Sequence, residues 1–218
     1  MVSKFQTSLD EIKTKILRIG EGLLEANTLI VEALATCDHD KFTEARSKIK
    51  NIGSKADDID NNIIKVLALY TPEARDLRHV IAYLKITNEL SRACSNTRSF
   101  VRGFTDVCTD VDVETINEYA VPMQTSTVKA IKLTLSMIEC PDAEEIQELY
   151  NEVLIEENKT DDLYEMVERN LSQQADGHSF EKFHKMLRAL RKSGKIASRA
   201  ISIANLLVYA KVGGNFHN

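Results

Sequence analysis

The sequence predicts an all-α fold, in which six long antiparallel helices form two tandem three-helix bundles. Apolar residues recur at spacings of three and four along most of the chain, which is the period of an amphipathic helix. No segment shows the alternation of apolar and polar residues that is typical of strands. Only 8 Gly and 3 Pro interrupt 218 residues, so the helices are expected to be long and their connections short.

Three helices are predicted in the first half, over residues 5–33, 42–70 and from Pro72 to about Gly103. The segment "CDHD" interrupts the apolar stripe after the first helix. Pro72 suits the first turn of the third helix, because a residue there needs no backbone N–H.

Three further helices are predicted after the polar joint "TDVCTDVD". The fourth covers residues 113–139 and should kink or restart at Pro122. The fifth should begin at "CPDAEE", where Asp142 can cap the helix and Glu145 follows three residues later. The sixth carries a stripe over residues 180–208. Because the halves look alike, we predict two repeats, at residues 1–105 and 111–214.

Composition excludes several classes of protein. The net charge of −5 disfavours a broad nucleic-acid-binding face. Neither an apolar run of membrane-span length nor a signal-peptide pattern is found, so a cytoplasmic location is expected. The four cysteines, Cys37, Cys94, Cys108 and Cys140, show no C-x-x-C spacing and are predicted to be free thiols.

We expect no enzyme, because no phosphate-binding glycine loop, G-x-S-x-G or H-E-x-x-H motif is present. Glu181 and His184 form one Glu-x-x-His, whereas a di-iron carboxylate bundle needs two.

The start of the third helix resembles the PhoU family of phosphate-signalling regulators. The resemblance rests on "P-x-A-x-D-L-R", which is followed by "LKI", and on the two repeats of three helices. The residues of the motif are Pro72, Ala74, Asp76, Leu77 and Arg78. From the residues alone, Asp76 and Arg78 could serve local capping or ion pairing as well as a contact with a partner protein.

The resemblance implies a regulator of phosphate uptake and of phosphate-starvation signalling. Its implied partners are phosphate transporter components and a sensor kinase at the inner face of the membrane, with a homodimer as an expected oligomer and no nucleic acid. It also implies that multinuclear iron or zinc clusters can bind through Glu/Asp-x-x-x-Asp motifs, whose carboxylates share one helix face.

This sequence departs from the family's metal motifs. Ser91 and Ser95 stand where carboxylates are expected in the third helix, and Gly194 and Ser198 stand there in the sixth. The fifth helix keeps Glu157 and Asp161. Serine hydroxyls are weak ligands for hard cations, so we interpret the patch as the remnant of a cluster.

No cofactor is therefore expected, although iron, zinc or magnesium remains an alternative at a residual site. The candidate metal ligands are Glu157, Asp161, Asp57 and Asp60. A metal-storage or metal-sensing protein and a helical scaffold unrelated to phosphate stay open as alternative functions, because a fold does not fix a function.

Overall fold

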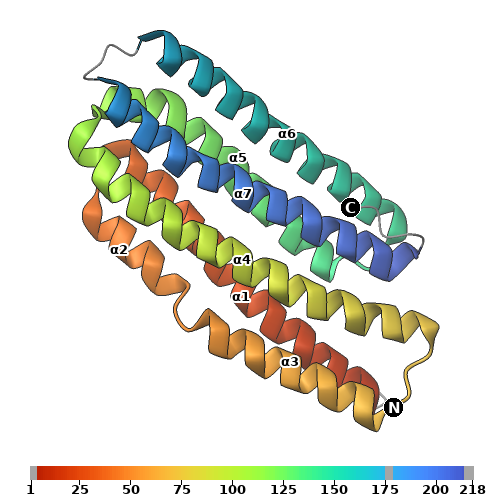
Figure 1. The fold of residues 1–218 in the computed structure, drawn as a ribbon. Coiled ribbons are helices and arrows are strands. Elements are labelled where there is room, and N and C mark those ends of the chain that lie inside the picture. Colours follow the sequence, from red (N-terminus) through yellow and green to blue (C-terminus); the bar gives the residue numbers. More distant parts are fainter. Residues whose placement is uncertain (1–3, 175–178, 214–218) are drawn as a thin grey trace.

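The computed structural model describes residues 4–174 and 179–213, and within them the chain forms seven α-helices and no strand (Figure 1). The predicted all-α fold is confirmed. The helices are α1 (Lys4–Thr36), α2 (His39–Lys48), α3 (Ile52–Leu69), α4 (Ala74–Asp110), α5 (Val113–Glu139), α6 (Ala143–Gln174) and α7 (Ser179–Val212).

Two groups of helices lie side by side and share one core. In the first, α2, α3 and α4 pack on α1, and in the second, α5, α6 and α7 pack together. The groups meet where α4 lies along α7 and α1 lies along α5, so α2 and α3 form one flank and α6 the other (Figure 1). Buried apolar side chains from both groups belong to a single hydrophobic cluster.

The predicted second helix is wrong in one respect, because it is divided into α2 and α3. Asn51 precedes α3 with a φ of 57°, a left-handed conformation that asparagine tolerates better than most residues. The end of α2 comes so close to α1 that a Cβ at Gly22 would lie 2.8 Å from the Lys48 carbonyl oxygen. Arg98 on α4 donates a 3.1 Å hydrogen bond to the carbonyl of Ile49. The chain at this break therefore packs closely against α1 and is hydrogen-bonded to α4.

Helix boundaries elsewhere follow from capping. The Asp142 side chain accepts hydrogen bonds from the backbone N–H groups of Glu144 and Glu145, which confirms the predicted cap, and these bonds lower the pKa of Asp142. Helix α4 runs to Asp110, beyond the predicted end near Gly103. Helix α5 does not restart at Pro122 but continues through it.

The expectation of four free thiols is wrong for one pair, because Cys37 and Cys108 form a disulfide with a Cα–Cα distance of 5.6 Å. Cys37 follows α1 with a φ of 55°, and the next residue, Asp38, donates its backbone N–H to the carbonyl of Ala33. This turn brings Cys37 to the last turns of α4. Cys94 and Cys140 are free and buried.

Candidate functional site

Two carboxylates of the predicted metal motif project from α6 toward α7. The hydroxyl of Ser198 donates a 3.2 Å hydrogen bond to Glu157 Oε1. Asp161 lies one turn further along α6, and its Oδ1 would be 3.9 Å from a Cβ added at Gly194. The structure therefore brings Glu157 and Asp161 close to Ser198 and Gly194, the two positions in the sixth predicted helix where the resemblance leads us to expect acids.

Neither carboxylate forms an ion pair with a cation in the part of the chain that the structure describes, and the surroundings of both disfavour the charged form. Burial raises the pKa of Glu157, and nearby Asp161 raises it further, against a smaller lowering by the Ser198 hydrogen bond. Burial also raises the pKa of Asp161, with contributions from Asp162 and Glu165. A cation between the two carboxylates would relieve this cost, but they offer it only one pair of acids.

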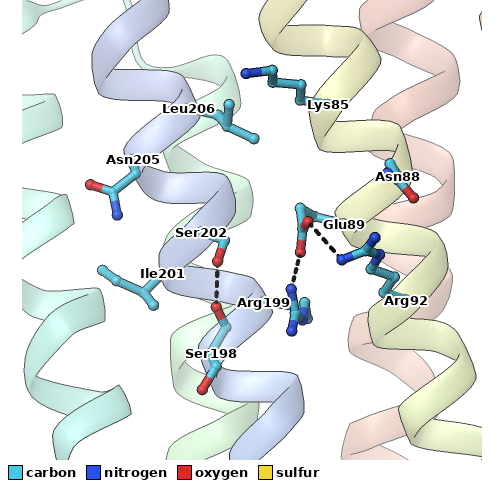
Figure 2. A pocket seen from close by; sticks show the side chains of 10 residues that line it. All are labelled: Lys85, Asn88, Glu89, Arg92, Ser198, Arg199, Ile201, Ser202, Asn205 and Leu206. Atoms are coloured by element: carbon cyan, nitrogen blue, oxygen red, sulfur yellow. Dashed lines mark hydrogen bonds and ion pairs between the residues drawn. The ribbon is translucent and has the colours of Figure 1, made fainter. Parts of the chain in front are cut away.

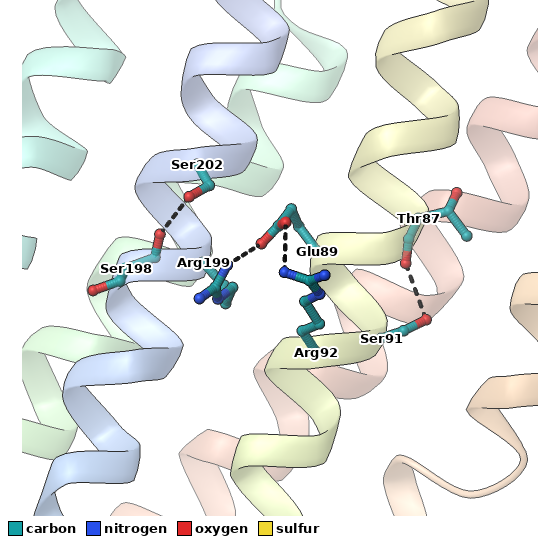
Figure 3. A network of polar contacts seen from close by, with 7 residues as sticks. All are labelled: Thr87, Glu89, Ser91, Arg92, Ser198, Arg199 and Ser202. Atoms are coloured by element: carbon teal, nitrogen blue, oxygen red, sulfur yellow. Dashed lines mark hydrogen bonds and ion pairs between the residues drawn. The ribbon is translucent and has the colours of Figure 1, made fainter. Parts of the chain in front are cut away.

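In the first half, the residues that stand where the resemblance leads us to expect carboxylates, Ser91 and Ser95, are also neutral. Ser91 donates a 3.0 Å hydrogen bond to the carbonyl of Thr87 on its own helix, as Ser202 does at 2.8 Å to Ser198 (Figure 3). Asp60 on α3 has a buried Oδ1 without a hydrogen-bond partner, and burial followed by the charge of Asp57 raises the pKa of Asp60.

The four candidate metal ligands lie in two separate places. Asp57 and Asp60 belong to α3 on one flank, whereas Glu157 and Asp161 belong to α6 on the other (Figure 1). No group of three or more potential ligands from His, Cys, Asp and Glu occurs in residues 4–174 and 179–213. These donor sets do not fit a multinuclear cluster, which needs several anionic oxygens at one point.

A hollow of about 620 Å³ lies between α4 and α7 (Figure 2). At its centre, Glu89 on α4 accepts a 2.9 Å hydrogen bond from Arg199 on α7 (Figures 2 and 3). Glu89 also lies 3.8 Å from Arg92 on its own helix. Glu89 thus neutralises much of the positive charge of the two arginines. The sequence analysis did not single out these residues. The spacing of Glu89 and Arg92 could have indicated their pairing, but only the fold brings in Arg199.

The motif at 72–78 lies where α3 is connected to α4. Arg78 is half-buried, and its guanidinium carbon lies 3.7 Å from the position of a Cβ on Gly213, just after α7. Leu77 points outward, with 40% of its surface exposed. Five exposed apolar side chains lie on the two helices that this loop connects: Ile64, Leu67, Leu69, Leu77 and Leu84.

Residues 16–101 match the protein family described as the PhoU domain. The predicted resemblance to the PhoU family is confirmed. The matched region covers most of α1 and continues through α2 and α3 into α4, and it includes the whole 72–78 motif.

Relatives extend the similarity to PhoU over the rest of the chain. A phosphate-specific transport system accessory protein PhoU homolog of Pseudomonas putida is 25% identical over 219 residues, covering 94% of this chain and 80% of the relative. The homolog of the same description in Aquifex aeolicus is 30% identical over 89 residues, or 41% of this chain and 40% of that protein.

Solved PhoU structures share the fold. PhoU from Pseudomonas aeruginosa has a TM-score of 0.85 at 21% identity, covering 97% of this chain and all of that structure. The phosphate transport system regulatory protein PhoU from Streptococcus pneumoniae has a TM-score of 0.80 at 18% identity, over 99% of this chain and 100% of that one.

Among the described helices, none combines the length and the apolar character that crossing a membrane requires.

Proposed function

We propose that this chain is a non-enzymatic regulator of phosphate uptake and phosphate-starvation signalling, which works through protein contacts at the inner face of the membrane. The observation that carries the proposal is the similarity to a phosphate-specific transport system accessory protein over 94% of the chain. The proposed partners are components of a phosphate transporter and a sensor kinase.

The exposed apolar residues around the 72–78 motif support a contact role. Leu69 is 73% exposed and Leu77 is 40% exposed, and Arg78 in the same motif lies close to Gly213 at the end of α7. Exposed apolar side chains at the end of α3 and near the start of α4 are a suitable surface for docking a protein partner. We call Ile64, Leu67, Leu69, Leu77 and Leu84 the Leu77 surface and assign it to a transporter component.

Deletion of the gene tests the proposal directly. The expected result is deregulated phosphate uptake, or expression of phosphate-starvation genes in phosphate-rich medium, with recovery when the intact chain is supplied. Unchanged uptake and unchanged starvation response in the deletion strain would overturn the proposal.

Complementation with variants tests the surface. The variant Leu69→Ser with Leu77→Ser should fold but fail to restore regulation, because it removes apolar contact area. Ile155→Ser on α6 is the control, since Ile155 is 53% exposed on the opposite flank (Figure 1).

A homodimer is part of the proposal and is checked by light scattering of the purified chain.

A carboxylate metal-binding function is the second candidate, favoured by the joint orientation of Glu157 and Asp161 toward α7. Elemental analysis of freshly purified, untagged protein tests it. One or more iron, zinc or magnesium ions per chain, lost in Glu157→Ala with Asp161→Ala, would support it. Metal-free protein after supplementation would exclude it.

A further inference from the structure

Charge is distributed unevenly over the second half of the chain. Helix α6 carries ten Asp or Glu residues and only two Lys or Arg, whereas α7 carries eight Lys or Arg and one Glu. The chain as a whole has a net charge of −5. Positive charge is therefore concentrated on α7, which lies along α4, in a protein that would otherwise repel anions.

A second hollow, of about 410 Å³, lies along the same α4 and α7 seam. Its floor is formed where Gly103 meets Ala189, and a Cβ at Gly103 would be 3.0 Å from the Cβ of Ala189. The lack of a side chain at Gly103 lets the two helices approach each other. Four cationic side chains and one acid stand around this floor: Arg102, Lys185, Arg188, Lys192 and Asp106.

Most of these cations are available to a ligand. Lys185 is engaged, at 3.1 Å from Asp110 and 3.8 Å from Glu181. Arg102, Arg188 and Lys192 make no ion pair or hydrogen bond with any residue that the structure describes.

The hollow at Glu89 provides the contrast on the same seam. There, Arg199 and Arg92 both interact with the carboxylate of Glu89, so a side chain of the protein provides the negative charge. At Gly103 and Ala189 no carboxylate of the described residues is paired with either arginine. Four cations and a single acid, Asp106, line this hollow, so the cations repel one another. An anion from solution would relieve this repulsion.

We propose that the hollow at Arg102, Arg188 and Lys192 binds a multiply charged phosphate anion of the pyrophosphate or tripolyphosphate class. Arginine forks match pairs of phosphate oxygens, and lysine adds a compact point charge. Three unpaired cations suit several negative charges better than one. The lining contains no aromatic side chain on which a nucleobase could stack, so the recognised part is the phosphate chain itself.

The site goes beyond the proposed regulatory function and does not depend on it. Binding is measured on the purified chain, whereas regulation is measured in a deletion strain, so either can fail alone. The probe is tripolyphosphate, titrated calorimetrically in a phosphate-free buffer, with pyrophosphate, orthophosphate and sulfate compared at equal ionic strength.

The test variant is Arg102→Gln with Arg188→Gln. The control is Arg75→Gln with Arg169→Gln, which removes the same charge from exposed positions outside the hollow. We expect the test variant to bind tripolyphosphate at least about tenfold more weakly, because it lacks two arginines that can make charge-assisted hydrogen bonds to the anion. The control should bind like the unaltered chain, and sulfate should bind more weakly than tripolyphosphate.

Three outcomes would overturn the proposal. They are no binding of tripolyphosphate or pyrophosphate by the unaltered chain, equal loss of affinity in the test and control variants, and equal affinity for sulfate. A lipid headgroup is distinguished by sedimentation with vesicles that contain phosphatidic acid. Arginine-dependent vesicle binding without binding of the free anions would assign the hollow to a membrane and overturn the assignment to a soluble phosphate anion.

Discussion

The side-chain amide of Gln124 on α5 donates a 2.8 Å hydrogen bond to Asn27 Oδ1 on α1, and both residues are fully buried. The network continues at both ends. Asn27 donates to Thr97 on α4 at 3.2 Å, and Ser193 on α7 donates to Gln124 Oε1 at 2.8 Å. One chain of polar contacts thus connects the four central helices, where the two halves meet. Because buried polar groups are costly without partners, this network favours a single register between the halves.

Removing Gln124 should therefore weaken the whole fold. Gln124→Ala removes the hydrogen-bond donor to the side-chain oxygen of Asn27, Oδ1. Ser193 can still pair with Thr127 at 2.8 Å. We expect the free energy of unfolding to fall by about 2–4 kcal/mol, from an unsatisfied buried acceptor and a cavity. Denaturant unfolding measures it. Gln147→Ala, at an exposed position of α6, is the control and should change stability by less than about 0.5 kcal/mol.

The helices could be predicted from the sequence because burial follows the helical period. Ile12, Ile16 and Ile19 are all fully buried or nearly so on the predicted stripe. The break at Asn51 could not be predicted, because the apolar rhythm continues across it, whereas the close approach of α2 to Gly22 and the hydrogen bond from Arg98 appear only in the fold. The division into repeats at 105 and 111 stays a prediction, and α4 runs across residue 105.

The candidate sites were predictable only where they rest on local spacing. Glu157 and Asp161 share a helix face because they are four residues apart, and the structure orients them toward Ser198 and Gly194. The basic hollow could not be found in the same way. Arg102 and Arg188 lie 86 positions apart, and only the antiparallel packing of α4 on α7 brings them together.

Two glycine substitutions should change stability in opposite directions. Gly22→Ala places a Cβ 2.8 Å from the Lys48 carbonyl oxygen, so backbone must move, and we expect a loss of about 1–3 kcal/mol. Gly53→Ala meets nothing within 4 Å and gains helix propensity at the start of α3, so a gain of about 0.5 kcal/mol is expected. Thermal and denaturant unfolding of the two variants check this. Equal effects would contradict the close approach of α1 to α2.

Reduction of the Cys37–Cys108 disulfide should destabilise the chain. The bridge joins residues 71 positions apart, and closing a loop of that size contributes about 4 kcal/mol in the chain-entropy description. Reductant should lower the free energy of unfolding of the unaltered chain and leave that of Cys37→Ser unchanged. Cys140→Ser is the control, which should keep the response to reductant. Alkylation of all four cysteines in the native, oxidised protein would contradict the bridge.

The raised pKa of Glu157 gives stability a defined dependence on pH. A carboxyl whose pKa is higher in the folded state binds its proton more tightly there. Its contribution is fully present below the pKa of the unfolded residue and is lost as the pH rises through the folded value. Glu157→Gln should therefore gain stability relative to the unaltered chain as the pH rises above the ordinary glutamate pKa of about 4.3. The exposed Glu148→Gln on the same helix should not, and a flat difference for Glu157→Gln would contradict the effect of burial.

Adding acids at Gly194 and Ser198 should create a metal site beside Glu157 and Asp161. Gly194→Glu with Ser198→Asp would place four carboxylates between α6 and α7. A side chain can start at Gly194 without a clash, because a Cβ there would lie 3.5 Å from Met123 Cε and 3.9 Å from Asp161 Oδ1, both ordinary contacts. Without metal, mutual repulsion should lower the melting temperature of this variant below that of the unaltered chain.

Added Mn²⁺ or Fe²⁺ should reverse that loss, since a ligand that binds only the folded state at a thousand times its Kd stabilises it by about 4 kcal/mol. Melting with and without metal, together with elemental analysis, measures the effect. Gly194→Ala with Ser198→Ala is the matched control, which changes the same positions without adding charge. If the carboxylate variant takes up no more metal than this control, four carboxylates at this place do not make a metal site and the prediction is wrong.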